Sequence, residues 1–541
     1  TPGRTGPPPA PPATPRSDSS ITRDSSPSAR HVPRATRLAA EGIRERLAVL
    51  PTGVDVASEI ISPDGRQLLL VATAANQQQL FAYPLDELST EPAIARQLTT
   101  TPGFKSSVQW APDSKSVWYL EQGRVVNLPV ESRSPRQLSL RAELDVDFAR
   151  EKMEVFNQAW EYLNDNFYDP SFHGANWSAV REAYAPIIAG ARTPDEMRRL
   201  LNLMIGEMNA SHMGISGPGG GTGLPGTGRL GLHFQRAAYE QRGQLEVTEV
   251  IPLSPAALSD RIHVGDFILA VDGARVAPGF NLDSALNFQF DHRVVLTVAA
   301  DASGRDKRDV ALRAVNGNTE KALLYRAWVA ERRAYVSRVS NGRLGYVHMN
   351  DMGGNAINQL NLDLDAEGHA KEGVVLDIRF NNGGFVNGHA LDVLSRQPYV
   401  LMVRRGVPPV PGRPVLGQRA LEAPTILVTN QATLSDGENF TEGYRTMKLG
   451  KVVGEPTAGW DVYTGAGVMV DGTSVRLPFM KNASLDGKAL ELVPRAVDIR
   501  VDRPLGESYT GKDVQLDAAV QELLAEIDAR GPRRAAASGS R

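Results

Sequence analysis

Cysteine is absent from this chain of 541 residues. Its absence excludes disulfide bonds, zinc sites with thiolate ligands and a thiol nucleophile. An excess of either charge is also lacking, because 59 basic residues nearly balance 62 acidic ones. We therefore expect neither nucleic acid nor a membrane surface as a partner. No apolar run approaches the roughly 18 residues that would span a bilayer, and none of these absences fixes the compartment.

The chain begins at Thr1, without a methionine or a signal-peptide pattern, which we interpret as a mature form or a fragment. Its length suggests three or four domains, and 41% hydrophobic residues are enough for several packed cores. None of the nine histidines lies in HExxH or another compact metal-binding pattern. We therefore expect no metal and no cofactor.

Both ends of the chain are predicted to be disordered. Residues 1–35 are rich in Pro, Ser, Thr and Arg and lack periodic apolar positions, and residues 530–541 read the same way. Residues 36–148 alternate short strands with turns. Two similar units, each with a Pro-Asp turn, lie about 49 residues apart, which is near the length of one propeller blade. We predict partial β-propeller-like repeats here.

Residues 149–216 are predicted to form a small helical subdomain. From Glu151, an amphipathic helix is indicated by apolar residues at helical spacing, namely Met153, Phe156, Trp160, Leu163 and Phe167. A second helix should begin at Thr193, with proline at its first position and Glu196 completing a capping box. The stretch NASHMGISG follows, so His212 is expected in the loop that leaves this helix.

Residues 217–228 are rich in glycine and are predicted to be a flexible linker. They contain a G-x-G-x-x-G pattern, at Gly221, Gly223 and Gly226. A dinucleotide site needs this pattern between a strand and a helix, whereas here a helix precedes it and a strand follows. We therefore do not expect a nucleotide site.

Residues 229–315 are predicted to form a small β domain. The motifs GLHF, SPA at 254–256 and VGDFILAVDG at 264–273 occur in this order, and with them the segment resembles a PDZ domain. The resemblance implies that an extended peptide binds by strand addition, with N–H groups of the first loop holding its carboxylate. The candidate peptide-binding residues are Gly231, Leu232, His233 and Phe234. A structural β module without a ligand is the alternative.

Residues 316–529 alternate strand-like and helical stretches, which predicts an α/β layer. The near-continuous apolar strand 424–429 runs into a turn and then a helix that begins near Ser435. A serine at a helix start is well placed for nucleophilic attack, and the next backbone N–H, that of Asp436, points where an oxyanion would form. A plain helix N-cap is the alternative for Ser435.

A second strand, ending at Phe380, runs into the sequence Asn381-Asn382-Gly383-Gly384. Two glycines free the backbone to turn and expose N–H groups, as the other half of an oxyanion hole requires. A plain turn would look the same in the sequence. A hydroxyl nucleophile also needs a base within hydrogen-bond reach and a third group that orients the base.

The order of the Ser-His pair, the NNGG turn and the TLSDGE stretch resembles the S41 serine peptidases of the tricorn type. That family carries propeller blades, a helical subdomain, a PDZ domain and a crotonase-like α/β domain in this order, and the resemblance spans about residues 50 to 525. It implies that Ser435 is the nucleophile and His212 the general base, with Ser211 beside it. It also implies oxyanion donors at Asp436 and Gly383, although Asn382 replaces a family glycine.

The fourth member of the family's site is a glutamate in a pattern close to E-N-x-G-V-x-P-D-I. This chain reads ELVPRAVDI, which aligns Glu491 with that glutamate and keeps Asp498 and Ile499 in register. Pro494 and Val497 depart from the pattern. On the residues alone, Glu491 is equally well explained as a solvated surface glutamate.

The related carboxy-terminal processing peptidases use a Ser-Lys dyad, with the lysine about 25 residues after the serine. Here Trp460 stands at that position, and an indole cannot accept a proton. An active hydrolase must therefore use a histidine, and His212 is the one in context. His233 and His263 fall within the PDZ-like pattern, and His348 lies in a strand.

The predicted fold class is multidomain α+β/β: partial propeller blades, a helical subdomain, a PDZ-like domain and an α/β catalytic domain. The predicted function is a serine endopeptidase acting on peptides. Two alternatives remain, an inactive peptide-binding scaffold and an acyl-CoA enzyme of the crotonase-like fold. The resemblance implies a homo-oligomer, by family a hexamer, and a cytoplasmic location, while the composition leaves an extracytoplasmic one open.

Overall fold

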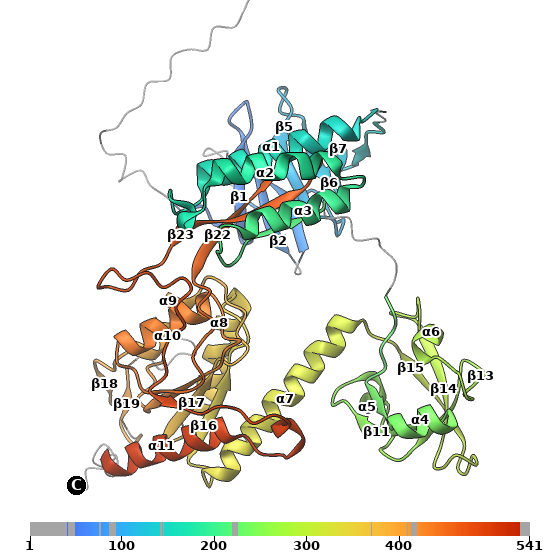
Figure 1. Cartoon of the computed structure of the whole chain (residues 1–541), viewed down its shortest axis with the longest axis vertical. Helices are drawn as coiled ribbons and strands as arrows, with labels where there is room; N and C mark the ends of the chain where they lie inside the picture. The colour runs from blue at the N-terminus through green and yellow to red at the C-terminus, as the bar shows by residue number, and fades with distance from the viewer. Residues whose placement is uncertain are drawn as a thin grey trace, which may run out of the picture. The chain divides into compact units, whose positions relative to one another are not determined.

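The computed structural model describes residues 41, 49–74, 77–85, 93–140, 143, 145–218, 226–368, 370–407, 409–412 and 419–530 (Figure 1). The predicted disorder of residues 1–35 and of the tail beyond Arg530, and most of the glycine-rich linker, lie outside these residues. Contacts divide the chain into two compact units, Thr1–Asp145 and Val146–Arg541. Among the described residues, no helix is long and apolar enough to cross a membrane.

The first unit contains two four-stranded antiparallel sheets, each formed by consecutive strands. The first sheet consists of β1 (Asp55–Ile61), β2 (Gln67–Ala74), β3 (Gln77–Pro84) and β4 (Arg96–Gln97). The second consists of β5 (Lys105–Trp110), β6 (Ser116–Glu121), β7 (Arg124–Pro129) and β8 (Arg136–Gln137). The predicted Pro-Asp turns join the first two strands of each sheet, so each unit begins one strand earlier than the sequence indicated. Four consecutive strands are the content of a propeller blade, and the propeller assignment stays a prediction.

The second unit begins with three helices, α1 (Phe148–Asn166), α2 (Trp177–Gly190) and α3 (Pro194–Gly206), with the short η1 (Phe172–Gly174) after α1. The first helix starts before the expected Glu151, because the Asp147 carboxylate caps it by accepting from the Ala149 N–H. Thr193 caps α3 as predicted, but Glu196 accepts from the Arg192 N–H rather than closing a capping box.

These helices share a hydrophobic core with a hairpin from the far end of the chain, β22 (Val462–Val468) and β23 (Ser474–Lys481). Strand β9 (Gly214–Ser216), directly after His212, pairs antiparallel with β23. Figure 1 shows the hairpin lying beside these helices. The sequence did not predict β9, and this strand fixes the loop that carries His212 to the C-terminal half of the unit.

Residues 229–315 form a six-stranded sheet with three short helices. Its strands are β10 (Leu232–Phe234), β11 (Leu245–Val250), β12 (Phe267–Val271), β13 (Ala274–Arg275), β14 (Arg293–Ala299) and β15 (Arg308–Arg313). Its helices are α4 (Arg236–Arg242), α5 (Pro255–Ser259) and α6 (Leu282–Ala285). The hydroxyl of Ser254 caps α5. Gly231, at φ +77°, packs tightly against Ser254, because a Cβ at Gly231 would lie 2.1 Å from Ser254 Cβ.

The long helix α7 (Gly317–Val339) leads into a five-stranded parallel sheet. The sheet order is β16 (Leu344–His348), β17 (Gly373–Asp377), β20 (Thr425–Thr429), β21 (Val452–Gly454) and β24 (Ile499–Arg500). One face packs against α8 (Gly354–Asp363), α9 (Asn387–Ser395) and α10 (Asp436–Thr446), and the other against α7 and α11 (Val514–Arg530). The remaining elements are η2 (Leu364–Gly368), β18 (Leu401–Met402), β19 (Val410–Pro411) and η3 (Glu507–Tyr509).

The predicted mixture of helices with several sheets is therefore confirmed, including the α/β layer. One strand end was wrong: β17 stops at Asp377 rather than at Phe380. There the guanidinium of Arg379 forms a buried ion pair with Asp377 and a second one with Asp513. These contacts turn the chain out of the sheet before the NNGG segment.

Candidate active site

Ser435 lies in the connection between the central strand β20 and helix α10, where the sequence predicted it. Its backbone has φ 55° and ψ −122°, a conformation that is costly for any residue other than glycine. The Ser435 N–H donates to the Trp460 carbonyl (3.0 Å) and lies 3.3 Å from Glu438 Oε1. The strained turn is thus held from two sides, and strain of this kind is common at functional sites.

The NNGG turn lies directly against Ser435. A Cβ at Gly383, which has φ +78°, would be 2.6 Å from Ser435 Cβ and 3.0 Å from the Asp436 nitrogen. Among the described residues, the Asp436 N–H has no acceptor, so it is available to an oxyanion. The Gly383 N–H donates to Asn381 Oδ1 (2.9 Å), whereas the N–H of Gly384 has no acceptor in the described part of the chain.

His212 lies between α3 and β9 and has φ 62°. Its Nδ1 is 2.8 Å from the hydroxyl of Ser211, and its Nε2 makes no hydrogen bond with the residues that the structure describes. Burial lowers the pKa of His212, the nearby Arg476 lowers it further, and Glu491 opposes the shift. The lowered pKa favours the neutral imidazole, the state in which it can accept a proton.

Glu491 is 8% exposed, which excludes the alternative of a solvated surface glutamate. One carboxylate oxygen accepts from the Ser211 N–H (2.8 Å) and the other from the Asp461 N–H (2.8 Å). Glu491 thus connects the Ser-His pair to the chain segment that follows Trp460. It contacts Ser211 through the backbone rather than through the hydroxyl.

Glu438 is a site residue that the sequence analysis missed. Its side chain is fully buried and accepts hydrogen bonds from the Thr457 hydroxyl (2.6 Å), the Gly459 N–H (2.7 Å) and the Trp460 N–H (2.6 Å). Burial raises the pKa of Glu438, although these donors act against the shift. The S-x-x-E spacing from Ser435, typical of a capping box, was the signal that could have identified it.

Asp461 is the second missed residue. It is fully buried; its Oδ1 accepts from the Asn482 amide (2.6 Å), and its Oδ2 has no partner among the described residues. Burial raises the pKa of Asp461 to about 6, with further contributions from Glu438 and Glu491. Nothing in the local sequence could have indicated this, because the burial comes from segments that are distant in the chain.

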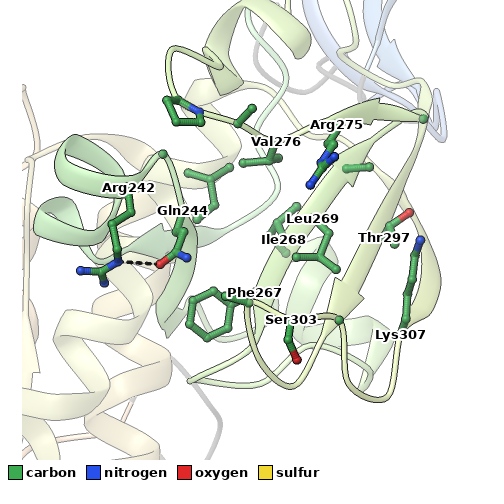
Figure 2. A pocket seen from close by; sticks show the side chains of 18 residues that line it. Arg242, Gln244, Phe267, Ile268, Leu269, Arg275, Val276, Thr297, Ser303 and Lys307 are labelled. Atoms are coloured by element: carbon green, nitrogen blue, oxygen red, sulfur yellow. Dashed lines mark hydrogen bonds between the residues drawn. The ribbon is translucent and has the colours of Figure 1, made fainter.

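The candidate peptide-binding loop has a different setting. Residues Leu232–Phe234 form β10, which lies at the edge of its sheet with β11 as its neighbour, and His233 Nδ1 is 2.8 Å from Glu249 Oε2. A cavity of about 730 Å³ in the same domain is lined by other residues, among them Phe267, Leu269 and Arg275 (Figure 2). None of the four candidate residues lines this cavity, so peptide binding at the β10 edge stays a prediction.

Comparison with known proteins identifies two parts of the second unit. Residues 148–206 match the family model of the tricorn protease C1 domain, and residues 343–501 match that of peptidase family S41. The chain is 28% identical over 523 residues to tricorn protease homolog 1 of Streptomyces coelicolor, covering 91% of this chain and 48% of that protein. It is 23% identical over 439 residues to the tricorn protease of Thermoplasma volcanium, covering 77% and 40% respectively.

A crystal structure of the tricorn protease has a similar fold, with a TM-score of 0.75 at 21% identity over 88% of this chain and 47% of that one. The chain thus spans about half the length of these relatives, or less. It contains one segment similar to the tricorn protease C1 domain and one similar to peptidase family S41, which confirms the resemblance seen in the sequence.

Proposed function

We propose that this chain is a serine endopeptidase that hydrolyses peptides. The observation that carries the proposal is that one residue contacts both halves of the divided site. The Trp460 carbonyl accepts from the Ser435 N–H, and the Trp460 ring lies edge-on to the His212 ring, with centroids 6.4 Å apart. Nucleophile and base, far apart in sequence, are thereby held against one short segment.

In the proposed reaction, Ser435 attacks the scissile carbonyl, and His212 accepts its proton and returns it to the leaving amine. Ser211 holds Nδ1 of the imidazole through its hydroxyl, and Glu491 holds the Ser211 backbone. This arrangement supports a Ser-His-Ser-Glu tetrad.

The oxyanion is held in this proposal by the N–H groups of Asp436 and Gly383, each worth about 3 kcal/mol in the transition state. The Gly383 N–H donates to Asn381 Oδ1 in this structure, so it must share or leave that acceptor when substrate binds. The adjacent N–H of Gly384 is the alternative second donor.

An inactive peptide-binding scaffold is the second candidate function. It is favoured by the edge position of β10, which leaves a strand available for peptide addition in a PDZ-like domain. Other parts of the proposal rest on family resemblance. They are a PDZ-like domain at residues 229–315, propeller-like repeats at 36–148, the remaining domain limits, a hexameric homo-oligomer and a cytoplasmic location.

Labelling with a fluorophosphonate probe tests the proposal, because such probes react with activated serine hydroxyls. We expect the wild type and the exposed-serine control Ser134→Ala to be labelled, and Ser435→Ala to remain unlabelled. Peptide mapping should place the label on Ser435. Folded wild-type protein that takes no label, or equal labelling of Ser435→Ala, would favour the scaffold.

A further inference from the structure

Trp460 has an unusual combination of contacts. Its backbone belongs to the nucleophile half, because its carbonyl accepts from the Ser435 N–H (3.0 Å) and its N–H donates to Glu438 Oε1 (2.6 Å). The preceding Gly459 is fixed in the same way, through its N–H to Glu438 Oε2 (2.7 Å) and its carbonyl to the Leu492 N–H (2.7 Å). The position of the Trp460 backbone therefore follows that of Ser435.

The side chain of Trp460 belongs to the base half. Its ring meets the His212 ring at an interplanar angle of 73° with 6.4 Å between centroids, within the favourable range for edge-to-face packing. The side chain is 48% exposed, so it is not a core residue on which folding depends.

We infer that Trp460 is a positioning residue for His212: its indole holds the imidazole in place and keeps water from it, while its backbone ties that contact to Ser435. The inference rests on the proposed function and deepens it.

The charged groups facing His212 come from two other segments, Arg476 on β23 and Glu491 from the loop that follows this strand. Both remain when Trp460 is changed. Burial is the largest cause of the lowered pKa of His212, so removal of the indole should raise that pKa. Trp460→Phe keeps a ring at the contact and should retain most of the shift.

Fluorescence tests the contact without any substrate, because a protonated imidazole quenches a neighbouring indole. The difference in emission between wild type and Trp460→Phe, followed over about pH 4 to 8, should titrate with a midpoint below the ordinary histidine value of about 6.5. The titration should disappear in His212→Gln and persist in Asp461→Asn, which removes the neighbouring carboxyl whose pKa is about 6. Trp328 is the matched control, because its ring packs edge-on to another histidine, His348, at 4.8 Å and 78°. Trp328→Phe should leave the Trp460 titration unchanged.

Kinetics test the positioning role. With a peptide substrate, Trp460→Ala should lower kcat on the order of tenfold with little change in KM, and Trp460→Phe should stay within about threefold of wild type. The acid limb of the pH profile should move to higher pH in the alanine variant alone.

Two results would overturn the inference. The first is a flat fluorescence difference in protein that still reacts with a fluorophosphonate. The second is a rise in KM for Trp460→Ala with an unmoved pH profile, which would make Trp460 a substrate-binding wall. Failure of the proposed function appears differently, as an intact fluorescence titration in protein that neither reacts with the probe nor cleaves peptides.

Discussion

The segment that carries Ser435 and the segment that carries His212 differ in how far along the chain their supporting contacts lie. Ser435 follows the central buried strand β20, and the carboxylate of Glu438, only three positions away, approaches its N–H. The neighbour of His212, Ser211, bonds to Glu491 across 280 positions, and β9 depends on pairing with β23. The nucleophile turn therefore has local support from Glu438 in addition to its contacts with Trp460 and Gly383, whereas the base is placed by contacts with distant segments.

The largest expected effect comes from removing either the nucleophile or the general base. Ser435→Ala and His212→Gln should each lower peptide turnover on the order of 10⁴-fold or more, because groups that act as one unit fail together. The double variant should be little worse than either single one. Melting temperatures close to that of the wild type would show that the folds are intact. If the loss of turnover in the double variant were the product of the two single losses, Ser435 and His212 would not act together.

The next largest effect is a loss of folding stability that is expected on the nucleophile side of the site, at Glu438. Glu438→Gln keeps the size of the side chain but directs an amide N–H₂ toward groups that are themselves donors, at a fully buried position. We expect a loss of unfolding free energy on the order of 2 kcal/mol, together with reduced turnover, because the turn at Ser435 loosens.

Glu442→Gln, one turn further along α10, is the matched control, since Glu442 is partly exposed and pairs with Arg495 at 3.3 Å. Denaturant titration of both variants measures the difference. Equal stability of the two variants would contradict a structural role of Glu438 in the nucleophile turn.

The sequence was most informative about the nucleophile half, for a physical reason. A continuous apolar run at 424–429 predicts a strand buried on both faces. The observed strand β20 spans Thr425–Thr429, and α10 begins right after Ser435. The NNGG turn was recognisable because its glycines allow a close approach, which Gly383 makes.

The base half was less accessible to such reasoning. A strand as short as β9 has no pattern of its own and forms only because β23 offers it an edge. His212 was found through a family resemblance and the exclusion of lysine at Trp460, rather than through local pattern. Asp461 was missed because no pattern in the neighbouring sequence indicates that its carboxylate is buried.

Asp461 predicts a stability change with pH. Its folded pKa of about 6 lies above the ordinary value of 3.8, so the folded state holds the proton more tightly than the unfolded state. The stabilisation is complete below about pH 4, falls as the pH rises toward 6 and is lost above it, with a total on the order of 2–3 kcal/mol.

Asp461→Asn cannot ionise and should remove this fall, which urea unfolding at pH 4, 5, 6 and 7 would measure. Asp486→Asn, at an exposed carboxylate whose pKa is lowered to about 2, should keep it. An unchanged dependence in Asp461→Asn would mean that the buried carboxyl ionises as it does in water.

The smallest expected effect concerns the electrostatics of the base. Arg476 lies on β23 opposite Gly214 of β9 and is the second-largest cause, after burial, of the lowered pKa of His212. Arg476→Gln should raise that pKa, so a larger fraction of the imidazole is protonated in mild acid. The acid limb of kcat/KM should then move to higher pH by less than about one pH unit, and kcat/KM at pH 7 should change by less than about threefold.

Added salt provides a second measurement. Because Arg476 is exposed, salt should move the acid limb of the wild type in the same direction and move that of the variant little. A limb that moves to lower pH, or that responds to salt equally in both proteins, would mean that the base is set by burial and Glu491 without Arg476.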